Sequence, residues 1–177
     1  MSQPQIQWSE DDDPAELARF FAANVDPTYV SHGEVEDGRA DADGAWVPDL
    51  EDVVTREISW ASGPEGRSAG ARVAVACSTD SDRELLGLAL VRVVESSGRP
   101  TLAWLDDLVL ERRARGSGLG RAMVGWVERE LASLGVERVF LECGHANSGA
   151  QRFFDRMQFR PTSIVLSKRL GVSDAGE

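Results

Sequence analysis

The chain is poor in cysteine, with only Cys77 and Cys143 among 177 residues and no CxxC pair. This scarcity favours two buried thiols over a disulfide framework or a metal site. No apolar run reaches the ~20 residues that span a bilayer. The N-terminal residues MSQP lack the basic and apolar parts of a signal peptide. We therefore expect a cytoplasmic protein without a membrane segment or a bound metal.

Basic side chains are also scarce, because 19 Lys and Arg stand against 30 Asp and Glu, which gives a net charge of −11. Nucleic-acid binding depends on a cationic surface, so this balance argues against a nucleic-acid partner. It permits a cationic partner such as an amine, a polyamine or a basic peptide, and it is equally consistent with solubility alone. The apolar fraction of 42% is typical of a globular protein. We predict one domain over residues 1–170 and a flexible tail over 171–177.

Hydrophobic periodicity and turn residues divide the chain into strands and helices. The segment 31–45 is polar and rich in Gly and Asp, which predicts a loop with short helical pieces. Asp13 and Pro14 are typical of a helix start. The predicted strands are 5–8, 73–77, 85–94, 102–110, 136–142 and 164–170, and the predicted helices are 14–25, 48–60, 119–134 and 148–157.

The order of these elements predicts the fold class. Three consecutive strands, 73–77, 85–94 and 102–110, indicate an antiparallel meander, and the strand–helix–strand crossover that follows adds a parallel pair. We therefore expect an α/β (α+β) fold with a mixed, mostly antiparallel central sheet of six to seven strands and helices on both faces.

A glycine-rich loop between a predicted strand and a predicted helix is the strongest functional signal. Residues 112–121 read RRARGSGLGR, and the first amides of a helix lack internal partners, so such a loop suits a phosphate group. No Lys-Ser or Lys-Thr follows the glycines, which excludes a Walker loop. A dinucleotide fingerprint would need glycine where Arg121 stands. The pattern that remains is [Q/R]xxGx[G/A], matched by Arg115, Gly118 and Gly120.

This motif, between a strand and a long helix in mid-chain, resembles that of the GCN5-related N-acetyltransferase (GNAT) superfamily. Leu110 ends the predicted strand five residues before Arg115, as in that family, and Asn147 and Phe159 follow at the family's spacing. The resemblance covers about residues 73–170. It implies a sheet that is splayed at its two central parallel strands.

The resemblance also implies acetyl-CoA as the acyl donor. Its pyrophosphate would lie on the loop amides and its pantetheine arm along the end of the preceding strand. The residues that this assigns to acetyl-CoA binding are Leu108, Val109, Leu110, Arg113, Arg115, Gly116, Ser117, Gly118, Leu119, Gly120, Arg121, Asn147 and Phe154.

The implied reaction is direct attack of a primary amine, from a small cationic molecule, on the thioester. Asp106 stands where many family members place the base or an amine-binding acid, and Asp107 is the second candidate. Adjacent strand residues point to opposite faces, so we expect only one of the two to reach the pocket. The candidates for the acceptor pocket are Tyr29, His32, Glu34, Glu36, Trp46 and Trp60.

Two positions depart from the family's pattern. Phe154 replaces the tyrosine that usually protonates the leaving thiolate, so water, His145 or Ser148 would have to substitute for it. Gln158 replaces a glycine that would make a left-handed turn easily. The missing tyrosine leaves open an acyl-CoA-binding regulatory module without catalysis. A protein or peptide N-acetyltransferase and a homodimer also remain open.

Overall fold

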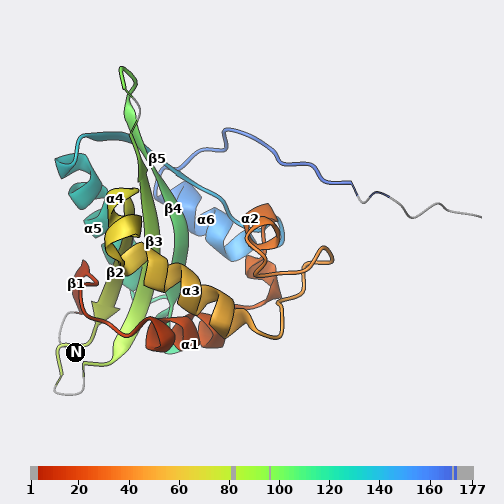
Figure 1. The fold of residues 1–177 in the computed structure, drawn as a ribbon, viewed down its shortest axis with the longest axis horizontal. Helices are drawn as coiled ribbons and strands as arrows, with labels where there is room; N and C mark the ends of the chain where they lie inside the picture. The colour runs from red at the N-terminus through yellow and green to blue at the C-terminus, as the bar shows by residue number, and fades with distance from the viewer. Residues whose placement is uncertain (1–3, 81–82, 96, 169, 171–177) are drawn as a thin grey trace, which may run out of the picture.

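A five-stranded sheet organises the chain in the computed structural model, which describes residues 4–80, 83–95, 97–168 and 170 (Figure 1). The strands follow chain order across the sheet: β1 (Gln5–Trp8), β2 (Ala71–Cys77), β3 (Leu85–Val94), β4 (Thr101–Leu110) and β5 (Val136–Leu141). All neighbours are antiparallel except β4 and β5, which are parallel. The mixed, mostly antiparallel sheet that the sequence predicts is thus confirmed.

Helices cover both faces of this sheet, and each face has its own apolar core. On one face α1 and α3 pack around Phe21, Val54 and Ile58, and on the other α5 packs through Met123 and Leu131. The helices are α1 (Pro14–Asn24), α2 (His32–Glu36), α3 (Leu50–Ser62), α4 (Pro64–Ser68), α5 (Leu119–Ser133) and α6 (Ser148–Arg156), with 3-10 turns η1 (Pro27–Tyr29) and η2 (Arg112–Ala114).

Local signals explain where the helices begin and end. Asp13 accepts a hydrogen bond from the amide of Ala15 at 3.0 Å, which caps α1 as its sequence predicts. The short α2 forms within the polar segment because Ser31 and Glu34 make a reciprocal capping box. The helix α5 ends before Gly135, whose φ of +77° is a left-handed conformation that glycine adopts without strain.

The prediction of a last strand over 164–170 is wrong. Residues 164–168 form no strand, and the segment runs away from the sheet (Figure 1). Ile164 and Leu166 are 86% and 89% exposed. The apolar segment, with the β-branched residues Ile164 and Val165, has strand propensity, but a strand also needs a hydrogen-bonded neighbour and a surface to pack on. The sheet therefore has five strands rather than six to seven, and the predicted tail 171–177 lies outside the described residues.

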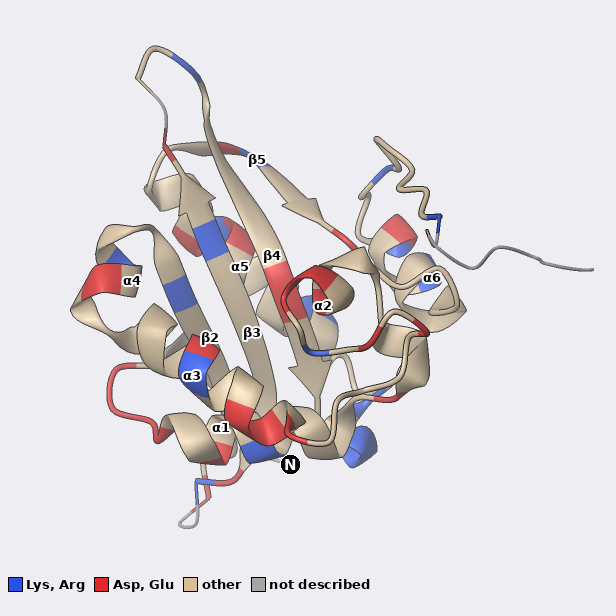
Figure 2. Cartoon of the chain, turned by 45° about the vertical axis from the view of Figure 1, so that its right-hand side comes forward, with Lys and Arg blue, Asp and Glu red and all other residues tan. Residues whose placement is uncertain are grey.

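The parallel pair separates along its length. β5 pairs with β4 from Thr101 to Leu105 only, and β4 then continues to Leu110 without it. Figure 2 shows β5 turning away from β4, with α2 on the side of the opening. This is the splay that the resemblance implies, but the parallel pair lies at the edge of the sheet and not at its centre, because the described residues after β5 add no further strand. The splay leaves backbone groups of β4 without a strand partner.

The loop after β5 packs tightly on η1 and so holds one side of the opening. A Cβ atom on Gly144 would lie 2.5 Å from the carbonyl oxygen of Thr28 and 2.6 Å from that of Val30. Because both obstacles are backbone atoms, we expect Gly144→Ala to lower the free energy of unfolding by about 1–3 kcal/mol in urea denaturation. The control is Gly149→Ala, whose Cβ would meet nothing closer than 3.6 Å. Equal unfolding free energies for the two variants would contradict this contact.

Candidate active site

A β-bulge lies where β4 begins to part from β5. Asp107 is opposite Leu90 on β3 and Leu105 is opposite Val91, so Asp106 is an extra residue without a cross-strand partner. A bulge of this kind turns two successive side chains to the same side of the sheet. Asp106 and Asp107 therefore both face the side on which α2 and α3 lie. The premise that the two side chains point to opposite faces is wrong, because it assumed a regular strand. Only Asp106 is accessible, since Asp107 is buried.

Asp107 is fully buried and held by three hydrogen bonds. Arg39 Nη1 donates to both carboxylate oxygens, at 3.1 and 2.9 Å, and the hydroxyl of Tyr29 donates to Oδ1 at 2.8 Å. Arg39 is itself buried and donates through Nε to Glu57 at 2.7 Å. Burial alone would lower the pKa of the Arg39 guanidinium, but Asp107 and Glu57 raise it above its ordinary value. Asp107 is thus a fixed, neutralised carboxylate inside the protein.

Asp106 has a different environment. Its side chain is one-third exposed and pairs with Arg92 on β3, with Nη2 at 2.9 Å from Oδ1 and Nε at 3.3 Å from Oδ2. Burial raises the pKa of the Asp106 carboxyl, although Arg92 acts to lower it. This carboxylate is the accessible member of the adjacent pair, and its basicity is higher than that of a fully solvated aspartate.

The backbone of β4 presents hydrogen-bonding groups to the opening. The amide of Glu111 donates to the carbonyl of Leu86 on β3 at 3.0 Å. Because the backbone groups of successive strand residues point alternately to the two neighbouring sides, this bond shows which residues of β4 face β3. The backbone groups of Leu108 and Leu110 consequently point away from β3, toward the side that β5 has left. The amide of Leu108 donates to the hydroxyl oxygen of Tyr29 at 3.3 Å. Tyr29, distant in sequence, therefore reaches the centre of the opening.

Two aromatic rings lie beside the accessible carboxylate. Trp104 on β4 and Phe140 on β5 stack with centroids 5.3 Å apart, one position before the last pair, Leu105 and Leu141, after which the strands separate. Trp104 precedes Asp106 by two residues on the same strand. Both rings are half-buried, so part of this aromatic surface is open to solvent.

The other candidates for the acceptor pocket are dispersed. His32 donates its backbone amide to Glu142 at 3.1 Å and contacts the same carboxylate through Nδ1, and this bond raises the pKa of His32. Glu36 lies on the same helix, 3.8 Å from Nε2 of His32. Glu34 is buried as the capping residue of α2, and Trp60 is 48% exposed on α3.

Trp46 belongs to an aromatic cluster rather than to the exposed rim. Its ring packs on Phe21 and Tyr29, with centroids 6.2 Å from each. The cluster fixes the position of the Tyr29 ring beneath the opening.

The glycine loop has the geometry of an anion-binding helix start. Gly116 and Gly118 have φ values of +79° and +95°, and added Cβ atoms would meet nothing within 4 Å, so the loop surface is open. Within the described part of the chain, the amides of Gly118, Gly120 and Arg121 donate no hydrogen bond. These unpaired donors lie at the positive end of the α5 dipole.

The arginines of the loop have unequal roles. Arg115 is directed inward, donating through Nε to the carbonyl of Leu110 at 3.4 Å and through Nη2 to that of Asn24. Arg113 pairs with Glu111 and with Glu84. Arg121 is exposed in the first turn of α5. The Arg115 side chain thus braces the loop, while its backbone remains part of it.

The downstream motif residues pack beside the loop. Asn147 caps α6 by accepting a hydrogen bond from the Ala150 amide at 3.0 Å. Phe154 contacts Phe153 and Phe159 edge-on, with centroids 5.0 and 5.6 Å apart. Gln158 adopts the left-handed turn with φ of +69° even though it carries a side chain.

His145 lies on the loop after β5. Its carbonyl oxygen accepts a hydrogen bond from Gln151 at 2.9 Å, and the residue is exposed. Ser148 begins α6 nearby in sequence.

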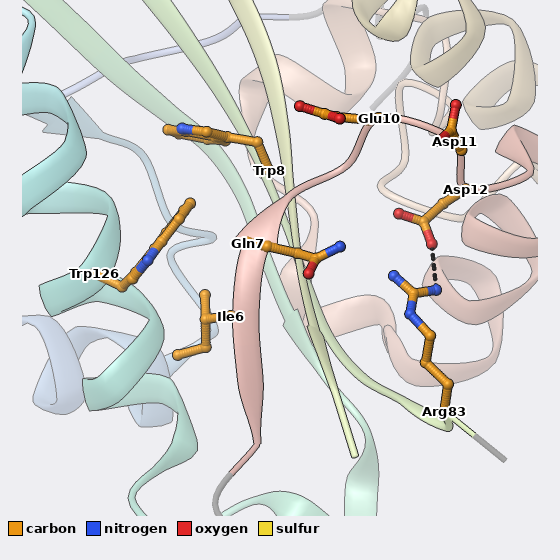
Figure 3. Close-up of a pocket in the computed structure, with 8 residues that line it drawn as sticks. All are labelled: Ile6, Gln7, Trp8, Glu10, Asp11, Asp12, Arg83 and Trp126. Atoms are coloured by element: carbon orange, nitrogen blue, oxygen red, sulfur yellow. Dashed lines mark hydrogen bonds and ion pairs between the residues drawn. The ribbon is translucent and has the colours of Figure 1, made fainter. Parts of the chain in front are cut away.

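A separate cavity of about 570 Å³ lies at the opposite edge of the sheet, beside β1 (Figure 3). The rings of Trp8 and Trp126 pack edge-on there, with centroids 4.8 Å apart, and Arg83 Nη1 lies 2.7 Å from Oδ1 of Asp12. None of the residues that the sequence assigns to catalysis or acetyl-CoA binding lines it. We place the candidate active site at the β4–β5 opening, where the backbone donors, the glycine loop and Asp106 converge.

Sequence reasoning missed four residues of this site: Arg39, Glu57, Arg92 and Glu142. None belongs to a motif, and Arg39 comes from the polar segment that was predicted as mostly loop.

Among the described residues, no group of three or more His, Cys, Asp or Glu side chains is arranged to hold a metal ion. No described helix is both long and apolar enough to cross a membrane.

The sequence model of the Acetyltransferase (GNAT) family matches residues 39–159. The chain therefore belongs to the GNAT acetyltransferase family. No curated protein sequence matches it.

Solved structures share the fold at low sequence identity. One is a tetramutant of the BH1408 protein from Bacillus halodurans, with a TM-score of 0.71 and 18% identity over 94% of this chain and 99% of that one. Another is an aminoglycoside acetyltransferase from an uncultured soil metagenomic sample, in complex with sisomicin. Its TM-score is 0.62 and its identity 14%, over 96% of this chain and 97% of that one. Glucosamine-6-phosphate N-acetyltransferase from Arabidopsis thaliana has a TM-score of 0.58 and 13% identity, over 94% of this chain and 99% of that one.

The two adjacent aspartates give a matched pair of stability tests. Asp107→Asn removes the charge that neutralises buried Arg39, so we expect a loss of about 3 kcal/mol in the free energy of unfolding. Asp106→Asn breaks only a partly exposed pair and should cost less than about 1 kcal/mol. Urea denaturation of both variants measures the difference, and a larger loss for Asp106→Asn would contradict the assignment of the buried pair.

Proposed function

We propose that the chain is an acetyl-CoA-dependent N-acetyltransferase that acetylates a primary amine of a small cationic molecule by direct attack. The observation that carries this proposal is the β4–β5 opening, where backbone groups without a strand partner and an accessible carboxylate lie beside an open, anion-binding helix start.

The loop and β4 suit the two ends of acetyl-CoA. The amides of Gly118, Gly120 and Arg121 can bind the pyrophosphate, supported by the helix dipole and by the exposed Arg121 side chain. The pantetheine amides can pair with the backbone of Leu108 and Leu110 as an added strand would. This places the thioester at the inner end of the opening, near the bulge.

Asp106 is the proposed base or amine anchor. A lysine-like amine has a pKa near 10.4, so only about 0.04% of it is neutral at pH 7. A carboxylate that collects the proton is worth roughly 10²–10⁴ in rate. Asp106 is accessible, and burial raises the pKa of its carboxyl, which favours it as the proton acceptor. Asp107 would contribute indirectly, by holding Arg39 and Tyr29.

The leaving thiolate can depart without the tyrosine that Phe154 replaces. A thiol has a pKa near 8.5, so the thiolate is a tolerable leaving group near neutral pH. Water, Ser148 or the exposed His145 is the proposed source of its proton.

An acceptor with positive charge fits the walls of the opening. Trp104 and Phe140 offer aromatic faces, which attract cations, and Asp106, Glu36 and Glu142 are acidic groups on the same side. The net charge of −11 would also attract a cation from solution. The aminoglycoside acetyltransferase that shares this fold gives a precedent for a polycationic acceptor. A cytoplasmic location and a homodimer are part of the proposal.

Release of CoA tests the activity directly. We expect thiol titration to detect acetyl-CoA-dependent turnover with one or more members of a panel of polyamines, aminoglycosides, amino acids and peptides. Asp106→Asn should lower kcat about 10²–10⁴-fold and leave acetyl-CoA affinity unchanged. Turnover confined to peptides would favour a protein N-acetyltransferase. Tight CoA binding without turnover on any amine would favour a regulatory module without catalysis and overturn the proposed enzyme.

The loop assignment has its own test. Gly118→Trp places a bulky side chain on the open loop surface at φ of +95°, so we expect at least a tenfold loss of acetyl-CoA affinity in calorimetric titration. The control is Gly98→Trp, which also has a positive φ of +71° and open space, but lies in the turn between β3 and β4. Equal affinities in the two variants would exclude the loop as the pyrophosphate site.

A further inference from the structure

The only tyrosine of the chain lies at the inner end of the opening, where the proposed mechanism has given it no part. The Tyr29 hydroxyl donates to Asp107 at 2.8 Å and accepts from the Leu108 amide at 3.3 Å. Leu108 is the residue of β4 whose backbone amide would meet the inner end of an acyl-pantetheine arm. Two hydrogen-bond donor groups therefore lie side by side, with the Leu108 N–H directed at the Tyr29 oxygen and the Tyr29 O–H directed at Asp107.

The distances allow both donors to bind one oxygen atom. The Leu108 nitrogen and the Tyr29 hydroxyl oxygen are 3.3 Å apart. A third atom can therefore lie about 2.9 Å, the usual hydrogen-bond length, from both of them. To donate to such an acceptor, the Tyr29 hydroxyl has to turn its proton away from Asp107 by rotation about the Cζ–Oη bond. Asp107 keeps its two hydrogen bonds from Arg39 when Tyr29 turns away, so it is not left unpaired.

The surroundings of Tyr29 keep it rigid and protonated. Its ring packs against Phe21 at 5.8 Å and Trp46 at 6.2 Å between centroids. Burial and the Asp107 carboxylate raise the pKa of the Tyr29 hydroxyl well above its ordinary value of 10, so it remains a donor at neutral pH. A donor that its surroundings hold in place is well suited to stabilise a developing oxyanion.

We propose that the Tyr29 hydroxyl and the Leu108 amide together form the oxyanion hole of the acyl transfer, a role that rests on the proposed function. The amine nitrogen bonds to the thioester carbon, and the C=O π electrons move to the oxygen, which Tyr29 and Leu108 bind. One proton leaves the nitrogen for Asp106. The C=O bond re-forms as the C–S bond breaks, and the departing thiolate recovers a proton from solvent, which completes the amide and CoA–SH.

This role differs from that of a general acid. Tyr29 keeps its proton throughout, so it does not replace the tyrosine missing at Phe154. It stabilises the tetrahedral intermediate instead, and the buried Arg39–Asp107 pair positions it. Asp107 then has a function although it cannot reach the amine.

The uniqueness of Tyr29 gives a test that needs no acceptor amine. Protein labelled with ¹³C at the tyrosine ζ carbon has a single labelled resonance, which reports on the hydroxyl of Tyr29. We expect acetyl-CoA to shift this resonance relative to the complex with CoA, which has no carbonyl. Identical resonances in two complexes that calorimetry shows to be saturated would overturn the oxyanion role while leaving acetyl-CoA binding intact. Failure of acetyl-CoA to bind would overturn the proposed function, and this inference with it.

Kinetics of Tyr29→Phe supply the second measurement. This variant keeps the ring and its packing, so we expect kcat to fall about 10²–10³-fold with acetyl-CoA affinity and KM for the amine changed less than threefold. Urea denaturation confirms that the variant is folded. An unchanged kcat would contradict the role, as would a loss that appears only as weaker acetyl-CoA binding.

Discussion

The buried ion pair between Asp107 and Arg39 is the interaction on which the site depends. It lies near the point where β4 and β5 part, and it brings together elements that are far apart in sequence: the segment after α2, the strand β4, and α3 through Glu57. A fully buried carboxylate is tolerated only when an opposite charge compensates it, and here Arg39 does so by donating hydrogen bonds to both carboxylate oxygens of Asp107. The same carboxylate holds the Tyr29 hydroxyl beside the β4 backbone.

The bulge at Asp106 gives the two adjacent acids separate environments. One is buried and neutralised by Arg39, and the other is partly exposed and paired with Arg92. A regular strand would have sent the second carboxylate to the face covered by α5, among apolar side chains. The irregularity therefore places a structural acid and a chemically available acid on the same side of one opening, next to the backbone groups that β5 leaves unpaired.

Motif and periodicity predicted most of the fold and the location of the opening. The glycine loop, the strand before it and the helix after it carry their own local signals, such as positive-φ glycines and apolar periodicity, and the structure has them in place. The ion-pair network could not be predicted, because Arg39, Glu57 and Arg92 meet their partners only through tertiary packing. The last strand was predicted wrongly since 164–170 has the composition of a strand, but the described part of this segment pairs with no edge of the sheet. Tyr29 was a candidate for the acceptor pocket, but its hydrogen bonds to Asp107 and Leu108 could not be predicted, because they form only through tertiary packing.

Chemical-shift mapping of ¹⁵N-labelled protein during an acetyl-CoA titration tests most directly whether the β4–β5 opening is the acyl-CoA site. The proposed function predicts that the amide resonances of Gly118, Gly120, Arg121 and the 108–110 stretch of β4 move together and saturate. The cavity beside β1 offers the contrasting outcome. Shifts confined to Trp8, Trp126 and their neighbours, with the glycine loop unchanged, would contradict the assignment of the site.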